Sequence, residues 1–202
     1  METLREKYAE NTRRALLDTG LRLFTERDYA SVPAEELVRT AGLTRGALYH
    51  HFDGKAGLFE AVFEELERQA TERIRAAIAP VPDARERAYR GVDVFLDVCA
   101  EPAYRNIVLQ QGPIALGWQR WRELDHLHLG GLVLDVVNDA LAAGRLRPHP
   151  AHLVARAFYG ALTELSITIA DTNEPEQARS QAAALVRDLI GGVVTDSDSP
   201  SV

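Results

Sequence analysis

Hydrogen-bonding side chains of several kinds crowd into residues 43–55, which read LTRGALYHHFDGK. An arginine can donate two hydrogen bonds to the edge of a guanine base, and threonine, tyrosine, histidine and lysine can donate to phosphate oxygens. Glycine lets a backbone approach a partner closely. These residue types therefore suit the binding of double-stranded DNA, provided that they lie on one face of one element.

The surrounding sequence predicts the helices that would position this stretch. Residues 9–27 carry apolar side chains at the i, i+4, i+7 spacing of a helix. A second helix is expected from Ser31, and Gly42 takes the left-handed conformation that ends it. Thr44 then caps a short third helix, and Asp53 begins a fourth. Two short helices joined by a glycine turn, behind a longer helix, form a helix-turn-helix.

A helical wheel places the polar residues of the third helix on one side, about 140° wide, with Leu48 pointing away towards the helix below. We predict that Arg45 specifies a guanine, and that Ala47 contacts a thymine methyl group or simply packs. The other polar side chains are expected to bind phosphates, helped by Lys55 near the start of the fourth helix. The predicted DNA-binding residues are Thr44, Arg45, Gly46, Ala47, Tyr49, His50 and Lys55.

The same residue types on an isolated helix usually form only a solvated face. Here the cap at Thr44, the turn at Gly42 and the inward apolar residues Leu43 and Leu48 occur together. This combination favours the functional interpretation.

No metal site, cofactor or enzyme activity is expected. His50 and His51 are adjacent in a helix and diverge by about 100°, and His126 and His128 diverge by about 200°. Cys99 is the single cysteine, so it forms neither an internal disulfide nor a thiolate metal cage. The sequence also contains no HExxH motif, no glycine-rich phosphate loop after a strand, and no nucleophile and base at motif spacing.

Residues 9–63 resemble the DNA-binding domain of the TetR/AcrR family of bacterial transcriptional regulators, and GLTRGALYHHFDGKAGLF matches the most specific run of that family. The resemblance implies that the third helix is the recognition helix. It also implies DNA contacts at six of the seven predicted positions, Gly46 being the exception. Ala56 and Gly57 depart from the family, where an acidic residue and a bulkier helix former are common.

Charge and hydropathy are typical of a folded, soluble protein. The net charge is −7, and residues 1–55 hold nine basic and nine acidic residues, so the whole deficit follows Lys55. A neutral segment binds DNA only if its basic groups share a face. The N-terminus has no apolar signal-peptide run and no stretch of about 18–20 consecutive apolar residues occurs, so a cytoplasmic protein that does not bind a membrane is expected.

The whole chain is predicted to be all-α, with about nine helices. A three-helix DNA-binding domain with a helix-turn-helix is expected at residues 1–55. A helical ligand-binding and dimerisation domain is expected at residues 56–191, and a disordered tail at residues 192–202. The segment around Gly112 and Pro113 is expected to be irregular, and one long helix is expected from Trp118 to a stop at Gly144.

Large side chains from separate segments of the C-terminal domain suggest a small-molecule cavity, although each of them alone is more often part of a core. In the family that the chain resembles, this domain holds the effector site. The predicted pocket residues are Phe63, Phe95, Tyr104, Ile107, Trp118, Trp121, His128 and Tyr159.

The last two predicted helices have broad apolar faces. Faces this wide usually need more cover than one small chain supplies, and pairing with a second copy gives an isologous four-helix bundle. Proteins of the TetR family dimerise in this way. The predicted interface residues are Leu153, Ala157, Phe158, Ala161, Leu162, Leu165, Leu185, Val186, Leu189 and Ile190.

These observations support two hypotheses about function. The first is a homodimeric, ligand-responsive transcriptional regulator, most simply a repressor that binds an inverted-repeat operator and is released by a small hydrophobic or aromatic effector. Its two recognition helices would enter major grooves about 34–36 Å apart. The alternative is a helical small-molecule-binding protein or enzyme that carries a non-essential helix-turn-helix, and turnover of a ligand would favour it.

Overall fold

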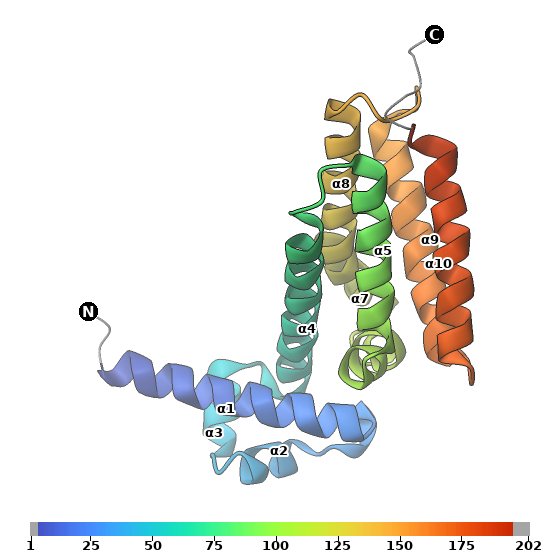
Figure 1. Cartoon of the computed structure of the whole chain (residues 1–202). Coiled ribbons are helices and arrows are strands. Elements are labelled where there is room, and N and C mark those ends of the chain that lie inside the picture. Colours follow the sequence, from blue (N-terminus) through green and yellow to red (C-terminus); the bar gives the residue numbers. More distant parts are fainter. Residues whose placement is uncertain (1–3, 196–202) are drawn as a thin grey trace. The chain divides into compact units, whose positions relative to one another are not determined.

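The computed structural model describes residues 4–195, and the all-α fold class is confirmed (Figure 1). Within that range the β pairing is limited to one isolated antiparallel bridge between Leu146 and Val194. The chain divides into two compact units. The first combines the chain up to Leu66 with Pro102–Trp121, and the second combines Glu67–Glu101 with the chain from Arg122 onwards.

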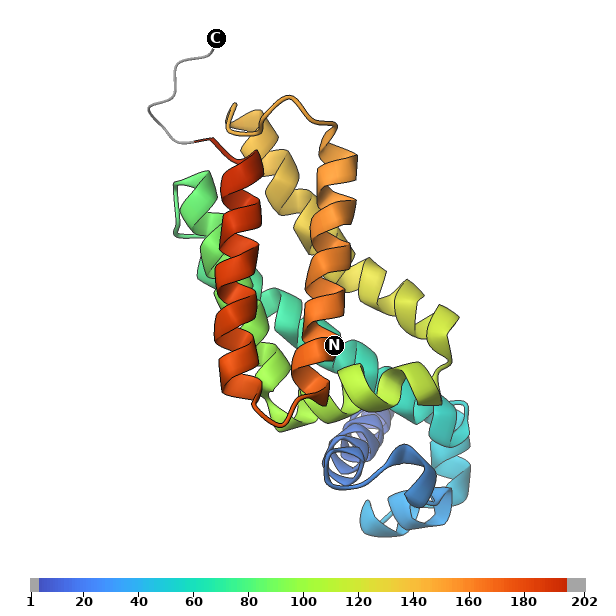
Figure 2. The same ribbon diagram turned by 90° about the vertical axis from the view of Figure 1, so that its right-hand side faces the viewer.

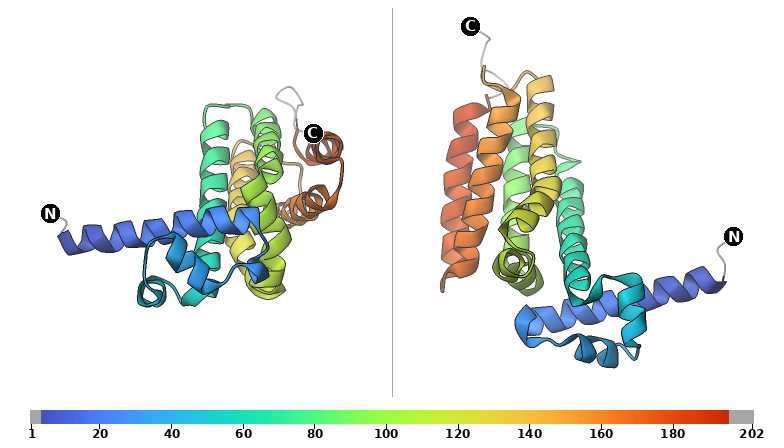
Figure 3. Two further views of the ribbon diagram at one scale, coloured as in Figure 1. Left: turned by 90° about the horizontal axis from the view of Figure 1, so that it is seen from below. Right: turned by 180° about the vertical axis from the view of Figure 1, so that it is seen from behind.

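The first unit contains the predicted helix-turn-helix, in which α1 packs against both α2 and α3 (Figure 3). Its core is aromatic and aliphatic, with Phe24 and Phe59 in edge-to-face contact at 5.2 Å between ring centroids. Leu16, Leu37 and Leu48 are also fully buried. The elements are α1 (Leu4–Glu26), a 3₁₀ turn η1 (Tyr29–Ser31), α2 (Ala34–Thr40), α3 (Arg45–His51) and the first part of α4 (Gly54–Ile78).

The segment from Pro102 to Trp121 also belongs to the first unit, because its side chains bind the backbone where α1 ends. Gln111 donates to the carbonyl of Phe24 (2.9 Å) and accepts from the N–H of Tyr29 (2.7 Å). Asn106 donates to the carbonyl of Thr25 at 2.9 Å. The last carbonyls of a helix lack partners within it, so these amides replace the missing bonds.

This segment is more regular than the sequence suggested. It forms a π-helical stretch η2 (Tyr104–Gln111), then α6 (Gly112–Ala115) and the start of α7 (Trp118–Asp125). The irregular conformation expected around Gly112 and Pro113 is therefore wrong. Pro113 lies in the first turn of α6, where its missing N–H would have no helical partner in any case.

The second unit is a bundle in which α10 packs on α5 and α9, and α8 packs on α9 (Figure 2 shows α9 in orange and α10 in red). The long helix expected from Trp118 is confirmed, with a π-helical stretch in its middle, and Gly144 ends it with a φ of 66°. The elements are the rest of α4, α5 (Ala84–Ala100), the end of α7, η3 (His126–Gly130), α8 (Gly131–Ala142), α9 (Ala151–Asp171) and α10 (Pro175–Val193).

The chain stays ordered beyond residue 192, where a disordered tail was expected. Helix α10 continues to Val193, and Val194 forms the bridge with Leu146. The N–H of Thr195 donates to the carbonyl of Arg145 at 2.8 Å. The sequence did not predict this pairing, because two glycines and a polar composition are typical of a disordered tail. Residues 196–202 lie outside the described residues.

Helix α9 meets the length and composition of a membrane span, with a mean hydropathy of 1.3 in its most apolar window. The helix has no long run of consecutive apolar residues, because Arg156, Thr163 and Glu164 interrupt it. One such helix is weak evidence for a membrane span, because the core helices of soluble proteins can have the same length and composition. Its inward side packs against α5, α8 and α10.

Candidate DNA-binding interface

The turn of the helix-turn-helix forms as the sequence predicts. Gly42 has a φ of 67°, in the left-handed region, and the N–H of Leu43 donates to the carbonyl of Val38 at 2.8 Å. Thr44 is the N-cap of α3, and its hydroxyl accepts from the N–H of Ala47 at 3.2 Å. The start and direction of α3 are therefore fixed by the glycine and the threonine.

The polar face of α3 is exposed, and Leu48 is fully buried on the other side. The guanidinium of Arg45 lies 5.6 Å from the centroid of the Tyr49 ring and forms an ion pair with Glu35 of α2 at 3.0 Å. Side chains this exposed gain little from pairing, so a DNA base can replace Glu35 at small cost. Glu35 was not predicted as part of this site, because its place ten residues before Arg45 follows no helical period.

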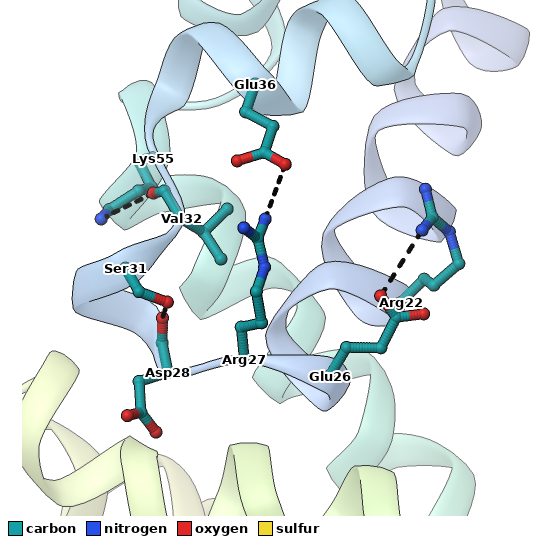
Figure 4. A network of polar contacts seen from close by, with 8 residues as sticks. All are labelled: Arg22, Glu26, Arg27, Asp28, Ser31, Val32, Glu36 and Lys55. Atoms are coloured by element: carbon teal, nitrogen blue, oxygen red, sulfur yellow. Dashed lines mark hydrogen bonds and ion pairs between the residues drawn. The ribbon is translucent and has the colours of Figure 1, made fainter.

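Lys55 has a structural role that the sequence did not reveal. Its ammonium donates to the carbonyls of Tyr29 (2.8 Å) and Val32 (3.0 Å; Figure 4) and lies 4.0 Å from the centroid of the Tyr29 ring. Burial lowers the pKa of Lys55. An ammonium has three donors, so one remains for the phosphate contact that the sequence predicts.

Two further contacts hold α2 and the end of α3 in place. Arg27 forms an ion pair with Glu36 of α2 at 2.7 Å (Figure 4). Phe52 is buried, and the guanidinium of Arg13 lies 5.5 Å from its ring centroid. His51 lies beside it and is half-buried. Burial lowers the pKa of its imidazole most, and the positive charges of the nearby His50 and Arg13 lower it further.

The eight residues predicted for a pocket are divided between the two units. The second unit contains a cavity of about 80 Å³ between α5, α8, α9 and α10, and Phe95 alone of the eight lines it. The rest of its lining is mostly aliphatic, so the aromatic residues of the sequence do not mark it. Five of the eight lie in the first unit, which holds Phe63, Tyr104, Ile107, Trp118 and Trp121.

Tyr159 takes part in a buried polar cluster in the second unit instead. Its hydroxyl donates to Asp125 at 2.6 Å, and the hydroxyl of Thr163 donates to the same oxygen at 3.4 Å. The rings of His126 and Tyr159 lie 5.0 Å apart, and the guanidinium of Arg122 lies 5.3 Å from the Tyr159 centroid. Burial is the main cause of the raised pKa of both Asp125 and Tyr159.

Replacing Asp125 with asparagine should stabilise the protein at neutral pH. Because the folded-state pKa of Asp125 is raised above its ordinary value, its contribution to the free energy of unfolding is fully present at acid pH and is lost as the pH rises through the raised pKa. Asparagine keeps an acceptor for Tyr159 and carries no charge. Urea unfolding at several pH values should show that Asp125→Asn is more stable than wild type near neutrality, with the difference shrinking towards acid pH.

Asp135→Asn is the matched control, since Asp135 is an exposed carboxylate of α8. It should change the free energy of unfolding only slightly at every pH. A stability gain for Asp125→Asn that did not depend on pH would contradict the electrostatic explanation.

The predicted dimer residues fall on two faces of α9 and α10. Leu162, Val186 and Ile190 are buried in the core of their own protomer, so they do not form part of the outer surface. Leu153, Leu185 and Leu189 are exposed, as is Ala157. Phe158, Ala161 and Leu165 are half-buried at the margin between the two faces.

Comparisons with known proteins agree with this architecture. Residues 16–62 match the model of bacterial regulatory proteins of the tetR family, and residues 85–193 match that of the tetracyclin repressor-like C-terminal domain. The chain is 41% identical over 59 residues to the transcriptional regulator AcrR of Shigella flexneri, a match that covers 29% of this chain and 27% of AcrR. It is 22% identical over 184 residues to the transposon Tn10 TetC protein of Escherichia coli, covering 90% and 91% of the two chains.

A solved TetR-family regulator from Pectobacterium atrosepticum has the same fold, with a TM-score of 0.83 and 29% identity over 94% of this chain and 97% of that one. The capped recognition helix, the glycine turn and the helical second unit define a helix-turn-helix transcriptional regulator. The chain belongs to the TetR family. Proteins of this family are transcriptional regulators and not enzymes, which favours the first of the two functional hypotheses.

Proposed function

We propose that this protein is a homodimeric cytoplasmic repressor that binds an inverted-repeat operator and releases it when a small hydrophobic or aromatic effector binds. The observation that carries the proposal is the exposed polar face of α3, positioned by Gly42 and Thr44. Arg45 would read a guanine, and Tyr49 and Lys55 would bind the DNA backbone.

The outer face of α9 and α10 supports a homodimer. Leu153, Leu185 and Leu189 expose large apolar side chains there, and Ala157 and Gly160 are small enough for another helix to approach closely. Pairing these faces about a two-fold axis gives a four-helix bundle in which each contact occurs twice. Two recognition helices would then reach two half-sites of an inverted repeat.

The cavity in the second unit supports control by a small molecule. Ile74 of α4 is among its lining residues, and the same helix begins at Gly54 in the first unit. RolR, a protein of the same fold at 16% identity and a TM-score of 0.68, was solved with resorcinol, so the fold admits a small ligand. An effector acts by binding one conformation more tightly than the other, and a difference of a few kcal/mol suffices.

The test is selection of random duplex DNA by the purified protein, followed by affinity measurements on the selected sequence. Wild type should enrich an inverted repeat. Arg45→Ala should relax the preference at one base pair of each half-site, at a cost of about 1–3 kcal/mol. Lys55→Ala should instead weaken binding to all sequences similarly and lower the slope of log affinity against log salt by about one.

Lys55→Ala should also lower the free energy of unfolding, because the carbonyl of Val32 loses the Lys55 donor and the carbonyl of Tyr29 keeps only the N–H of Val32 (3.3 Å). Tyr49→Ala tests the proposed contact with the DNA backbone without a large effect on stability, because Tyr49 is exposed. Equal effects of Arg45→Ala and Lys55→Ala on sequence preference would refute the division of roles. Failure of wild type to enrich any sequence, with and without candidate effectors, would refute the repressor.

A further inference from the structure

The cavity of the second unit is lined by hydrocarbon and is partly open to solvent. It runs between α5, α8, α9 and α10 from Phe95 to the Leu146–Val194 bridge, and its walls are mainly valine, leucine and alanine side chains. Of the described residues that line it, only Arg87 has a polar side chain. The affinity of any occupant must therefore come from burial of apolar surface.

The one polar side chain in the lining is already engaged elsewhere. The Nε of Arg87 donates to the carbonyl of Val81 (2.9 Å), one Nη to the carbonyl of Pro82 (3.2 Å) and the other to the carboxylate of Asp139 (3.2 Å). Asp139 also neutralises its charge. Arg87 thus presents its methylene groups to the cavity and uses its charged end to bind the α4–α5 connection and α8.

The backbone at the end of the cavity is also satisfied. The carbonyl of Val193 accepts from the N–H of Arg147 at 2.9 Å, and the carbonyl of Val194 accepts from the guanidinium of Arg85. The N–H of Val194 donates within α10 to the carbonyl of Ile190. A ligand that carried a carboxylate or hydroxyl into this space would find these groups already occupied, and an unpaired buried charge is strongly unfavourable.

The volume of the cavity restricts the class of ligand further. The cavity volume is about 80 Å³, and an engineered apolar cavity of about 150 Å³ in another protein holds one benzene. A compact molecule smaller than benzene, of about five carbon atoms or fewer, is the appropriate occupant. A flat bicyclic ligand is too large to lie wholly within this volume.

We propose that the effector is a small, uncharged, aliphatic compound that lies in the cavity between α5, α8, α9 and α10. The inference rests on the proposed function, in which a small molecule controls DNA binding, and it specifies the chemistry and the place of that molecule. Because α9 and α10 form two walls of the cavity and also carry the proposed dimer face, a bound ligand stabilises one arrangement of these two helices.

The experiment compares isoprene with methacrylate, which has nearly the same shape but replaces a vinyl group with a carboxylate. Binding of each to the full-length protein is measured without DNA by isothermal titration calorimetry. We expect isoprene to bind at least about a hundredfold more tightly than methacrylate, because the carboxylate would be buried without a partner. Xenon, detected by the chemical shift of ¹²⁹Xe, is a second probe of the same apolar space.

A matched pair of variants on α8 locates the site. Ala140 is buried and lines the cavity, whereas Ala142 is exposed on the same helix. Ala140→Leu fills the cavity and should weaken isoprene binding by at least about tenfold, and Ala142→Leu should leave it unchanged. Gly91→Ala is a milder filling variant, since a Cβ there would lie 3.5 Å from Ile78, an ordinary contact distance.

The outcomes separate this inference from the proposed function. The inference would be overturned if methacrylate bound as tightly as isoprene, or if neither isoprene nor xenon bound. It would also be overturned if neither filling variant weakened isoprene binding. The effect on DNA is measured last, on the sequence that wild type selects, where isoprene should lower the affinity for the operator. Isoprene binding without that effect would show a ligand site that is not the effector site. Failure to select any DNA sequence would instead contradict the proposed function and leave the binding result as it stands.

Discussion

Leu185→Asp is expected to dissociate the proposed dimer into monomers and to lower the affinity for an inverted-repeat operator by about 10²–10⁴-fold. Leu185 exposes 49% of its surface on the outer face of α10, next to Leu189 one turn further on. In an isologous interface the substitution places two carboxylates at the seam, where desolvation and repulsion act together. The loss of operator affinity follows because the second recognition helix no longer binds as part of one molecule.

Leu141→Asp is the matched control for this prediction. Leu141 exposes 50% of its surface at the end of α8, outside the proposed interface, so the same change in charge and volume should leave the dimer intact. Analytical ultracentrifugation gives the oligomeric state, and fluorescence anisotropy gives the affinity for operators with one or two half-sites. A Leu185→Asp protein that remained dimeric at micromolar concentration would place the interface elsewhere.

The two faces of α9 and α10 illustrate where prediction from the sequence stops. The apolar spacing predicts both helices, but it does not separate residues that face their own core, such as Val186, from residues that face outwards, such as Leu185. These two neighbours differ by about 100° on the helix, so only the positions of α5 and α9 decide which one is buried. A broad apolar stripe therefore predicts an interface without giving its members.

The helix-turn-helix was predicted more completely because its determinants are local. The left-handed Gly42, the cap at Thr44 and the inward Leu48 each depend on residues within one or two helical turns. The second role of Lys55 depends on the carbonyls of Tyr29 and Val32, more than twenty positions earlier, which leave no periodic signal. The cavity likewise depends on how four helices pack, and aliphatic lining residues look like core residues in a sequence.

Trp121 packs within the 102–121 segment of the first unit. Trp121 is fully buried, and its indole N–H donates to the carbonyl of Val108 at 2.9 Å. Gly112 leaves room for the ring, since a Cβ there would lie 2.8 Å from Cδ1 of Trp121. Trp121→Ala should therefore lower the free energy of unfolding by about 3–5 kcal/mol, as measured by urea denaturation.

Trp118 supplies the matched control, because it is the same residue type three positions earlier. Its ring lies 4.9 Å from that of Trp121, yet 56% of its surface is exposed, so Trp118→Ala should cost at most about 1 kcal/mol. Trp121→Phe should fall between the two, because it keeps most of the packing and leaves the carbonyl of Val108 without its donor. Equal losses at the two tryptophans would mean that stacking between the rings, and not burial of Trp121 beside Gly112, stabilises the segment.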